Sequence, residues 1–279
     1  MIVFCIDRFC GEREAYIPFR NRGMYFGEGI FETMRAENGN INFLQKHLWR
    51  LISSAAYFSI PVSYSADELR TIIIELLQKN SLTDAIVRIS LSGGEIQSYE
   101  KYSSRSTSSL LCIEAKQYQR TFPDETTICF SSSPLLHGDL LRQHKTTQYL
   151  RNVMEARTAR ENGFDEAIFT DEQFHILEGT RTNIFILKEG KIITPALSCG
   201  ILPGVMRSVV AEICTEHSLL FEERIITRNE IEEAEEMFLT NALNGIIPVH
   251  YFASQRLLKN GITSALQQFF HKKKSEFMQ

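Results

Sequence analysis

The spacing of apolar residues predicts two helices in the first third of the chain. Apolar residues recur every three or four positions between Leu44 and Ala55, which places them along one side of a helix. Ser65 and Glu68 have the spacing of a capping box, in which each side chain binds a backbone N–H group of the first turn. A second helix is therefore expected between Ser65 and Asn80, where the apolar pattern ends.

Shorter apolar runs bounded by turn residues predict strands. In the first part of the chain they are expected at residues 1–6, 29–35, 85–92 and 110–115, with a tight hairpin turn at Asn38-Gly39. Later strands are expected at 127–131, 166–170, 174–177, 182–187, 191–194, 221–227 and 237–240. Later helices are expected at 147–162, from 205 onward and at the acidic run 230–236. This mixture of hairpins and helices favours an α+β fold over a doubly wound parallel sheet.

A polar stretch that contains Pro123 separates two groups of predicted elements. We therefore expect a smaller N-terminal domain at 1–118, a linker at 119–125 and a larger C-terminal domain at 126–279. A chain of 279 residues is long enough for two domains of ordinary size, and such cores need neither disulfides nor a structural metal.

Composition and charge exclude several classes of function. The chain has 30 Lys+Arg and 34 Asp+Glu, a net charge of −4, whereas nucleic-acid binding requires a basic face. No apolar run approaches the roughly 20 residues that span a bilayer. The six cysteines include no Cys-x-x-Cys pair, so free thiols in the cytoplasm are expected and no metal centre. The N-terminal apolar run is too short for the core of a signal peptide.

Lys145 is a candidate nucleophile. It lies near Arg142 in sequence and just before a predicted helix, for which Thr146 or Thr147 is the expected N-cap. The positive end of a helix and a nearby guanidinium both favour the neutral amine, the form that attacks carbonyl carbons. By position alone, a solvated loop lysine is the simpler interpretation.

Glu178 and Arg50 are candidate ligands of a charged small molecule. Glu178 closes the predicted strand 174–177, where it could pair with a ligand cation or be a solvated turn residue. Arg50 lies about 100° around its helix from the apolar stripe. From there it could bind a phosphate through two N–H groups, or pack its stem on the core.

The segment from Gly200 to Arg207 leads into a predicted helix and could bind an anion. Gly204 allows a ligand to approach the backbone closely, and the N–H groups of Val205 and Met206 would point out of the helix start. Many ordinary helix starts have a similar composition, so this segment is informative only together with the others.

An amine, a carboxylate, a guanidinium and a backbone anion site are the groups that pyridoxal 5′-phosphate (PLP) needs. The amine forms a Schiff base with the aldehyde, and the carboxylate keeps the pyridine nitrogen protonated so that the ring accepts electrons. The other two groups hold the phosphate. The four candidates therefore suggest a PLP site.

The sequence resembles the fold-type-IV PLP enzymes, the class-IV aminotransferase family. The resemblance extends from residues 22–32 to residues 241–249, and the order and spacing of the motifs carry it. It implies a two-domain α+β fold with PLP in the interdomain cleft, and a homodimer that acts on a small amino-acid-like substrate.

Single residues match the motifs of that family. By this similarity Lys145 is the Schiff-base lysine, Glu178 faces the pyridine nitrogen, and Arg50 binds the phosphate. Further phosphate-side contacts, the first two through backbone amides, are implied for Val205, Met206 and Asn241. Two departures stand out: Met206 occupies a position where the family often has Thr, and Arg181 is a bulky residue at a variable position.

The shared catalytic residues do not choose between two reactions. One is the lyase reaction, in which 4-amino-4-deoxychorismate loses pyruvate and gives 4-aminobenzoate for folate synthesis. The other is transfer of the amino group to a 2-oxo acid, as in branched-chain and D-amino-acid aminotransferases. Residues 241–243 and 248–249 resemble the lyases, and the spacing of Lys145 and Tyr149 differs from the longer form of the branched-chain enzymes. We therefore expect a lyase, with an aminotransferase as the alternative and a PLP-fold binding protein without turnover as a third possibility. Arg88 could bind the substrate carboxylate or be a structural strand residue.

Overall fold

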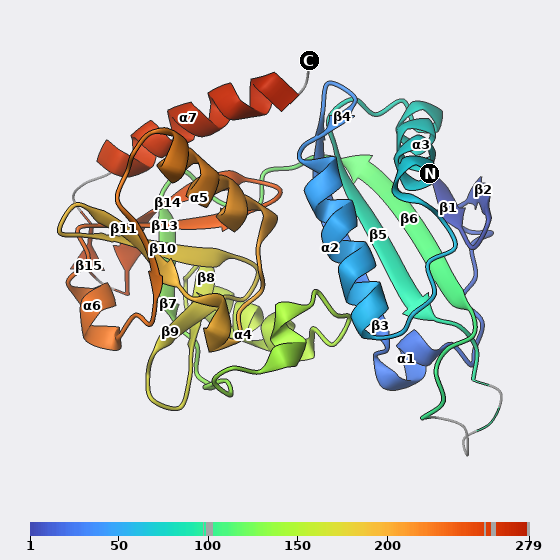
Figure 1. Cartoon of the computed structure of the whole chain (residues 1–279), viewed down its shortest axis with the longest axis horizontal. Coiled ribbons are helices and arrows are strands. Elements are labelled where there is room, and N and C mark those ends of the chain that lie inside the picture. The colour runs from blue at the N-terminus through green and yellow to red at the C-terminus, as the bar shows by residue number, and fades with distance from the viewer. Residues whose placement is uncertain (97, 99–102, 254, 258–260, 278–279) are drawn as a thin grey trace. The chain divides into compact units, whose positions relative to one another are not determined.

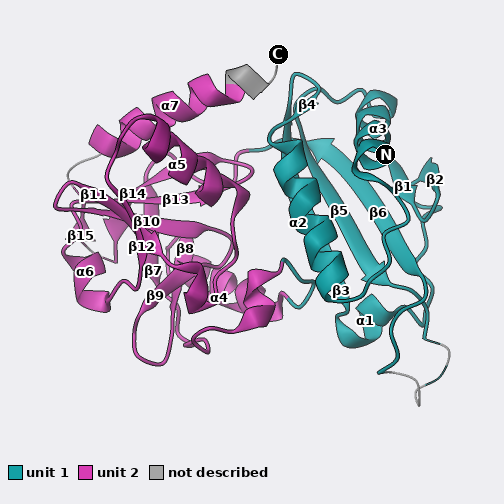
Figure 2. Cartoon of the chain, viewed as in Figure 1, with its two compact units in different colours: residues 1–119, 145–148 teal, residues 120–144, 149–279 magenta. Residues whose placement is uncertain are grey.

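The computed structural model describes residues 1–96, 98, 103–253, 255–257 and 261–277. The chain divides into two compact units (Figure 2). Unit 1 consists of Met1–Gln119 and Lys145–Gln148, and unit 2 consists of Arg120–His144 and Tyr149–Gln279. Lys145–Gln148 therefore packs with unit 1, although it lies far along the chain. The domain limits expected from the sequence stay a prediction.

Unit 1 is an antiparallel sheet covered by helices (Figure 1). Its strands are β1 (Ile2–Cys5), β2 (Arg8–Gly11), β3 (Gly29–Glu37), β4 (Asn40–Ile41), β5 (Ala85–Gly93) and β6 (Ser109–Gln117). They pair in the order β2-β1-β6-β5-β3-β4. Its helices are α1 (Arg22–Phe26), α2 (Leu44–Tyr57) and α3 (Ala66–Lys79). The apolar sides of α2 and α3 pack on the sheet in one core that includes Met34, Leu48 and Ile73.

Unit 2 is a larger mixed sheet with helices. Its strands are β7 (Thr126–Phe130), β8 (Glu166–Thr170), β9 (Ile176–Gly179), β10 (Asn183–Lys188), β11 (Lys191–Pro195), β12 (Phe221–Arg224), β13 (Glu236–Asn241), β14 (Gly245–Phe252) and β15 (Gln255–Arg256). Their order is β12-β11-β10-β13-β14-β7-β8-β9, and β15 pairs with β14. Its helical segments are η2 (Leu140–Gln143), α4 (Leu150–Glu161), η3 (Leu197–Cys199), α5 (Val205–Glu216), α6 (Arg228–Glu232) and α7 (Gly261–Phe277).

The structure confirms the α+β class and several local predictions. Ser65 and Glu68 form the capping box of α3, with both reciprocal hydrogen bonds present. Asn38 and Gly39 adopt φ values of 50° and 78° in the turn between β3 and β4, as a tight hairpin turn requires. No described helix is long and apolar enough to cross a membrane.

Several predicted element boundaries were wrong. The acidic run expected as a helix at 230–236 is divided between α6, which ends at Glu232, and β13, which begins at Glu236. The strand expected at 221–227 ends at Arg224. The helix expected from residue 147 begins at Leu150, because the preceding segment pairs with β3. The strand expected from Phe174 begins at Ile176, because Phe174 has a left-handed backbone with φ of 62°.

Candidate functional site

Backbone pairing with β3 holds the segment that carries Lys145. The N–H group of Phe31 donates to the carbonyl oxygen of Lys145 at 2.8 Å, and the N–H group of Thr147 donates to Gly29 at 2.8 Å. The Lys145 ammonium group lies 4.5 Å from the centre of the Phe31 ring, and the Arg88 guanidinium lies 3.9 Å from the same ring. Lys145 and Arg88 are therefore two cations placed around one aromatic side chain of unit 1.

The sequence-based reason for a neutral Lys145 was partly wrong. That reason placed the lysine beside the positive end of a helix dipole, but α4 begins only at Leu150, with Tyr149 as its N-cap. The field of a helix dipole is felt mainly within its first turn. A half-buried position, paired with β3 through the backbone and beside the Phe31 ring, replaces the helix start as the local environment of Lys145.

Arg50 forms a buried ionic cluster with Glu32 and His47. Its Nε and Nη2 donate to the two carboxylate oxygens of Glu32 at 2.7 and 2.8 Å, and His47 Nδ1 lies 2.7 Å from Glu32 Oε2. All three residues are at most 7% exposed. Glu32 comes from β3, whereas His47 and Arg50 come one turn apart from α2. The fork of Arg50 is thus fixed by a carboxylate that the sequence analysis did not identify.

The pKa values of Glu32 and His47 are set by burial and by the charges around them. Burial alone would raise the pKa of Glu32, but the positive charge of Arg50 and the hydrogen bonds from His47 and Arg50 outweigh it and lower the pKa to about 2. Burial lowers the pKa of His47 against the opposing effect of Glu32, and the charges of Arg50 and Lys145 add to the lowering. His47 is therefore held neutral beside an ionised Glu32.

We expect acid to destabilise the protein through Glu32. A group whose folded pKa is depressed contributes stability above its unfolded pKa and loses it as the pH falls. The lowering of the Glu32 pKa from 4.5 to about 2 corresponds to about 3 kcal/mol of unfolding free energy. This stability is lost as the pH falls from 4.5 to about 2. Glu32→Gln should lower the unfolding free energy at neutral pH by about 3 kcal/mol, because Arg50 loses its buried counter-charge.

Urea unfolding measured between neutral pH and pH 3 tests this expectation. The difference in unfolding free energy between the wild type and Glu32→Gln should shrink as the pH falls through that window. The exposed Glu75 provides the matched control, Glu75→Gln, which should follow the wild type. A difference that stays constant with pH would contradict the assigned charge of Glu32.

Glu178 is a buried member of a hydrogen-bonded group in unit 2. It lies within β9 and is 6% exposed, so the alternative of a solvated turn residue was wrong. Its carboxylate accepts from Arg142 Nη2 at 2.7 Å, from the Leu202 N–H group at 3.0 Å and from Asn183 Nδ2 at 3.4 Å. A cation and two neutral donors therefore hold the Glu178 carboxylate in one orientation.

The start of α5 packs tightly against Asn183. Gly204 is the N-cap residue, and no side chain caps the N–H groups that follow it. A Cβ atom on Gly204 would lie only 1.9 Å from Asn183 Oδ1, so glycine is required for this close approach. Val205 and Met206, the first two helical residues, are buried. Since Asn183 also contacts Glu178, the carboxylate and the helix start belong to one group of residues.

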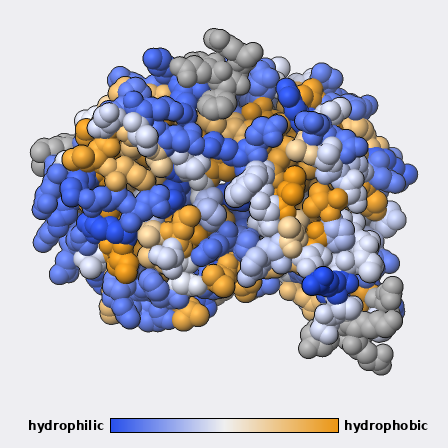
Figure 3. Space-filling view, in the orientation of Figure 1, coloured by the Kyte–Doolittle hydropathy of each residue, from blue (hydrophilic) through white to orange (hydrophobic). Residues whose placement is uncertain are grey.

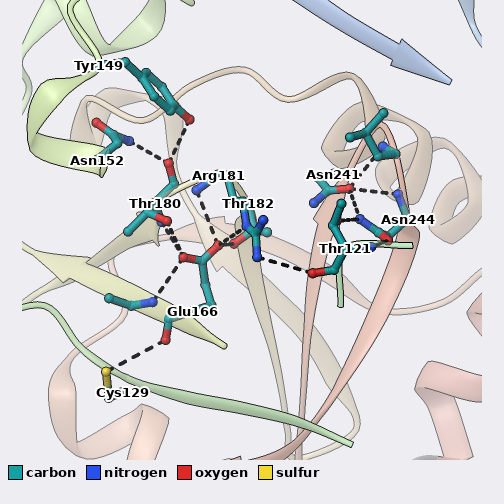
Figure 4. A network of polar contacts seen from close by, with 12 residues as sticks. Thr121, Cys129, Tyr149, Asn152, Glu166, Thr180, Arg181, Thr182, Asn241 and Asn244 are labelled. Atoms are coloured by element: carbon teal, nitrogen blue, oxygen red, sulfur yellow. Dashed lines mark hydrogen bonds and ion pairs between the residues drawn. The ribbon is translucent and has the colours of Figure 1, made fainter. Parts of the chain in front are cut away.

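Asn241 and Thr240 end β13 near that group. Asn241 Oδ1 accepts from the N–H groups of Leu243 and Asn244 at 3.1 and 2.9 Å, which closes the turn into β14 (Figure 4). Thr240 lies opposite Asn183 in the β10–β13 pair. Its hydroxyl is buried and has no hydrogen-bond partner among the described residues. Sequence analysis did not identify Thr240, because a threonine inside an apolar strand is common.

A second carboxylate, Glu166, fixes the loop that follows Glu178 (Figure 4). It accepts from the hydroxyls of Thr180 and Thr182 at 2.5 and 3.1 Å and from the Thr180 N–H group at 3.0 Å. On the other side of the loop, Tyr149 and Asn152 both donate to the Thr180 carbonyl oxygen, at 2.8 and 2.7 Å. Burial raises the pKa of Glu166 and of Tyr149. The segment after Glu178 is thus held from both sides.

Each unit therefore carries some of the residues that the sequence predicted to bind PLP. Unit 1 places Lys145 and Arg50 around β3 and α2, and unit 2 groups Glu178 with the start of α5. Sequence analysis missed Glu32 and the role of Arg142 as the partner of Glu178. The signal available for Glu32 was a carboxylate directly after Ile30 and Phe31, inside a predicted strand.

Comparisons with known proteins agree on one family. The family model of amino-transferase class IV matches residues 29–252. The D-alanine aminotransferase of Bacillus licheniformis is 28% identical over 280 residues, which cover 96% of each chain. The crystal structure of a branched-chain aminotransferase from Thermoproteus uzoniensis is 27% identical, covers 98% of this chain and 94% of its own, and has a TM-score of 0.90.

A third similar protein carries a different description. The structure of a Legionella pneumophila "Putative 4-amino-4-deoxychorismate lyase" is 28% identical, with a TM-score of 0.87, and covers 92% of this chain and 95% of its own. The family match spans most of the sequence and both units. This chain therefore belongs to the class IV amino-transferase family and is a PLP-dependent enzyme.

Proposed function

We propose that Lys145 of unit 1 and Glu178 of unit 2 bind the same PLP molecule. Lys145 would bind the aldehyde covalently, and Glu178 would face the pyridine nitrogen. The phosphate would lie against the N–H groups of Val205 and Met206, with Arg50 as a charged partner. Asn241, whose Oδ1 is engaged in the β13–β14 turn, is proposed for the phosphate side as well.

The residues present fit this cofactor. The start of α5 has N–H groups that no side chain caps, and such a helix start binds phosphate well. The buried Thr240 hydroxyl has no partner among the described residues and could donate to an oxygen of the same ligand. Glu178 is buried beside these groups with its charge held by Arg142. Met206 contributes its backbone only, because its thioether is no substitute for a hydroxyl donor.

The side chains of this chain would perform the binding and the proton transfer. When bound, PLP supplies a ring that accepts the electron pair left at the substrate Cα. Lys145 would take the proton from Cα and return it, and Glu178 would keep its negative charge against the ring nitrogen. Arg142, held at 2.7 Å from Glu178, would keep that carboxylate in place. Arg88, beside the same Phe31 ring as Lys145, is proposed for the substrate carboxylate.

For the reaction, we propose the loss of pyruvate from 4-amino-4-deoxychorismate. Sequence identity does not decide, because the relatives described with either activity are 27–28% identical to this chain. The lyase-like segments at 241–243 and 248–249 carry the proposal. Transfer of an amino group from a branched-chain or D-amino acid is the second candidate, and the named aminotransferase relatives favour it.

Single-turnover assays on the PLP-loaded enzyme separate the two reactions. With 4-amino-4-deoxychorismate, the lyase is expected to release 4-aminobenzoate and pyruvate in equal amounts, and the absorption spectrum of the cofactor should return to its initial state. L- and D-amino acids should leave the spectrum unchanged. Conversion of the cofactor to its amine form by an amino acid, with no 4-aminobenzoate from the first substrate, would instead establish an aminotransferase.

We also propose a cytoplasmic homodimer. Phe19, Met24 and Trp49 of unit 1 and Leu150 of unit 2 are at least 70% exposed. Apolar patches lie among polar side chains on the face shown in Figure 3. Contiguous apolar patches of this kind are typical of surfaces that a partner covers.

A further inference from the structure

His137, Asp171 and His175 bring three metal-ligating side chains together in unit 2. The Nδ1 atoms of His137 and His175 lie 2.7 and 2.9 Å from the same oxygen, Oδ2 of Asp171. One nitrogen of each imidazole and one oxygen of the carboxylate all lie within 4.8 Å of one another. The two rings are nearly perpendicular, with centres 6.1 Å apart. The cluster takes no part in the proposed PLP site.

The turn between β8 and β9 fixes two of these residues. Asp171 follows the last residue of β8, and His175 precedes the first residue of β9. Asp171 Oδ1 accepts from the N–H groups of Gln173 and His175 at 2.9 and 2.8 Å. Because Oδ1 is occupied by the backbone, Oδ2 is left directed at the imidazoles.

Backbone contacts bring the third residue, His137, from another part of the chain. The Leu135 N–H group donates to the Thr170 carbonyl oxygen at 2.8 Å, and the His137 N–H group donates to the Glu172 carboxylate at 3.2 Å. Gly138 is held in turn by the Cys199 carbonyl oxygen at 3.0 Å. The position of His137 beside Asp171 therefore does not depend on its side chain alone.

The charge and exposure of the cluster suit a cation. Asp171 is fully buried, and its carboxylate contacts both imidazoles and two backbone N–H groups. The side chains of His137 and His175 are 39% and 20% exposed, so an ion can enter from solvent. Water could then complete the coordination.

We propose that His137, Asp171 and His175 bind one Zn²⁺ ion. Imidazole nitrogens and carboxylate oxygens are ordinary zinc ligands, and three protein ligands with one water form a tetrahedral site. Such a site needs ligand atoms about 3.3 Å apart. Each imidazole would therefore move away from Oδ2 by less than about 1 Å, and the two imidazole nitrogens, which lie within 4.8 Å of each other, would approach by up to about 1.5 Å. Two imidazoles disfavour Mg²⁺ and Ca²⁺, which prefer oxygen ligands. Each Nδ1 atom, which faces Asp171, would have to be deprotonated in order to bind the ion. The proton would move to Nε2 of the same ring or to solvent.

The sequence analysis expected no metal centre because it searched for ligands near the cysteines. His137 lies 34 residues before Asp171, and no metal-ligand motif spans that distance. A bound ion would tie the loop before η2 to the β8–β9 turn. The two histidines and Asp171 would then hold the ion, with one coordination position left to water.

Calorimetric titration of the tag-free PLP-loaded enzyme with ZnCl₂ tests the site. The wild type is expected to bind one Zn²⁺ per chain and no Mg²⁺. His137→Ala and His175→Ala should each weaken zinc binding by more than about 100-fold, because each removes a direct ligand. The control is His217→Ala, which changes an exposed histidine at the C-cap of α5. It should leave zinc binding unchanged. Co²⁺ should give the visible absorption bands of a tetrahedral site in the wild type and in His217→Ala, but not in His137→Ala or His175→Ala.

A second variant guards against misfolding. Asp171→Asn retains Oδ1 as the acceptor for Gln173 and His175 but removes the negative charge from the cluster, so it should fold and yet lose zinc affinity. Circular dichroism checks each fold. The absence of zinc binding by the wild type, or equal binding by His137→Ala/His175→Ala, would overturn the proposal and leave a hydrogen-bonded Asp–His cluster.

Discussion

Lys145→Ala is expected to lose the covalent bond to the cofactor and at least about 10³-fold of turnover, because one amine both attaches PLP and moves the substrate proton. Borohydride treatment of the wild type should fix the cofactor on the chain, and intact-mass spectrometry should show the added mass. The same treatment of the variant should leave the mass of the chain unchanged.

The structure makes Lys145→Ala a clean test. The bonds that hold this segment to β3 are made by backbone atoms of Lys145 and Thr147, which alanine retains. The variant should therefore keep its fold. Lys79→Ala, at an exposed lysine of α3 paired with Glu75, is the matched control and should behave as the wild type. A Lys145→Ala protein that still turns over would end the assignment of this residue.

Glu178→Gln is expected to reduce turnover by about 100-fold or more, because a neutral amide cannot compensate the positive charge on the ring nitrogen. The amide oxygen can still accept from the Leu202 N–H group, but the Arg142 guanidinium loses its counter-charge. Removing one partner of a buried pair costs about 3 kcal/mol or more, so the melting temperature should fall as well.

A double variant separates the loss of turnover from the loss of stability in Glu178→Gln. Glu178→Gln/Arg142→Gln removes both charges of the pair and should recover part of the lost stability without recovering turnover. Glu161→Gln, at the exposed end of α4, is the control for charge alone. Full activity of Glu178→Gln, with an unchanged absorption spectrum of the bound cofactor, would contradict the proposed contact with the pyridine nitrogen.

The sequence predicted well those helices and turns that are determined by residues close together in the chain. The capping box of α3, the Asn38-Gly39 turn and the apolar side of α2 each depend on residues a few positions apart. The start of α4 could not be predicted in this way. Its expected first turn is drawn into pairing with β3, a strand more than 100 residues earlier, and sequence patterns do not show such a competition. The strand β14 and the helix α7 had not been predicted either.

The candidate site was predicted mainly through the family resemblance. On position alone, Lys145 and Glu178 were more simply ordinary surface residues, and only the order of the motifs selected them. Their partners were missed because the contacts are long-range. Glu32 reaches Arg50 from another element, and Arg142 reaches Glu178 across 36 positions. A sequence hints at a buried charge only when a charged residue falls inside a predicted strand, as Glu32 does directly after Ile30 and Phe31.

The assignment of Lys145–Gln148 to unit 1 bears on how this gene could be divided. The polypeptide passes between the units three times, after residues 119, 144 and 148. A truncated product that stops at Gln119 would leave the Phe31 amide hydrogen and the Gly29 carbonyl without the chain segment that engages them. Neither unit is one uninterrupted stretch of the chain. A recombination event that exchanged unit 1 between two relatives would therefore have to exchange residues 145–148 together with residues 1–119.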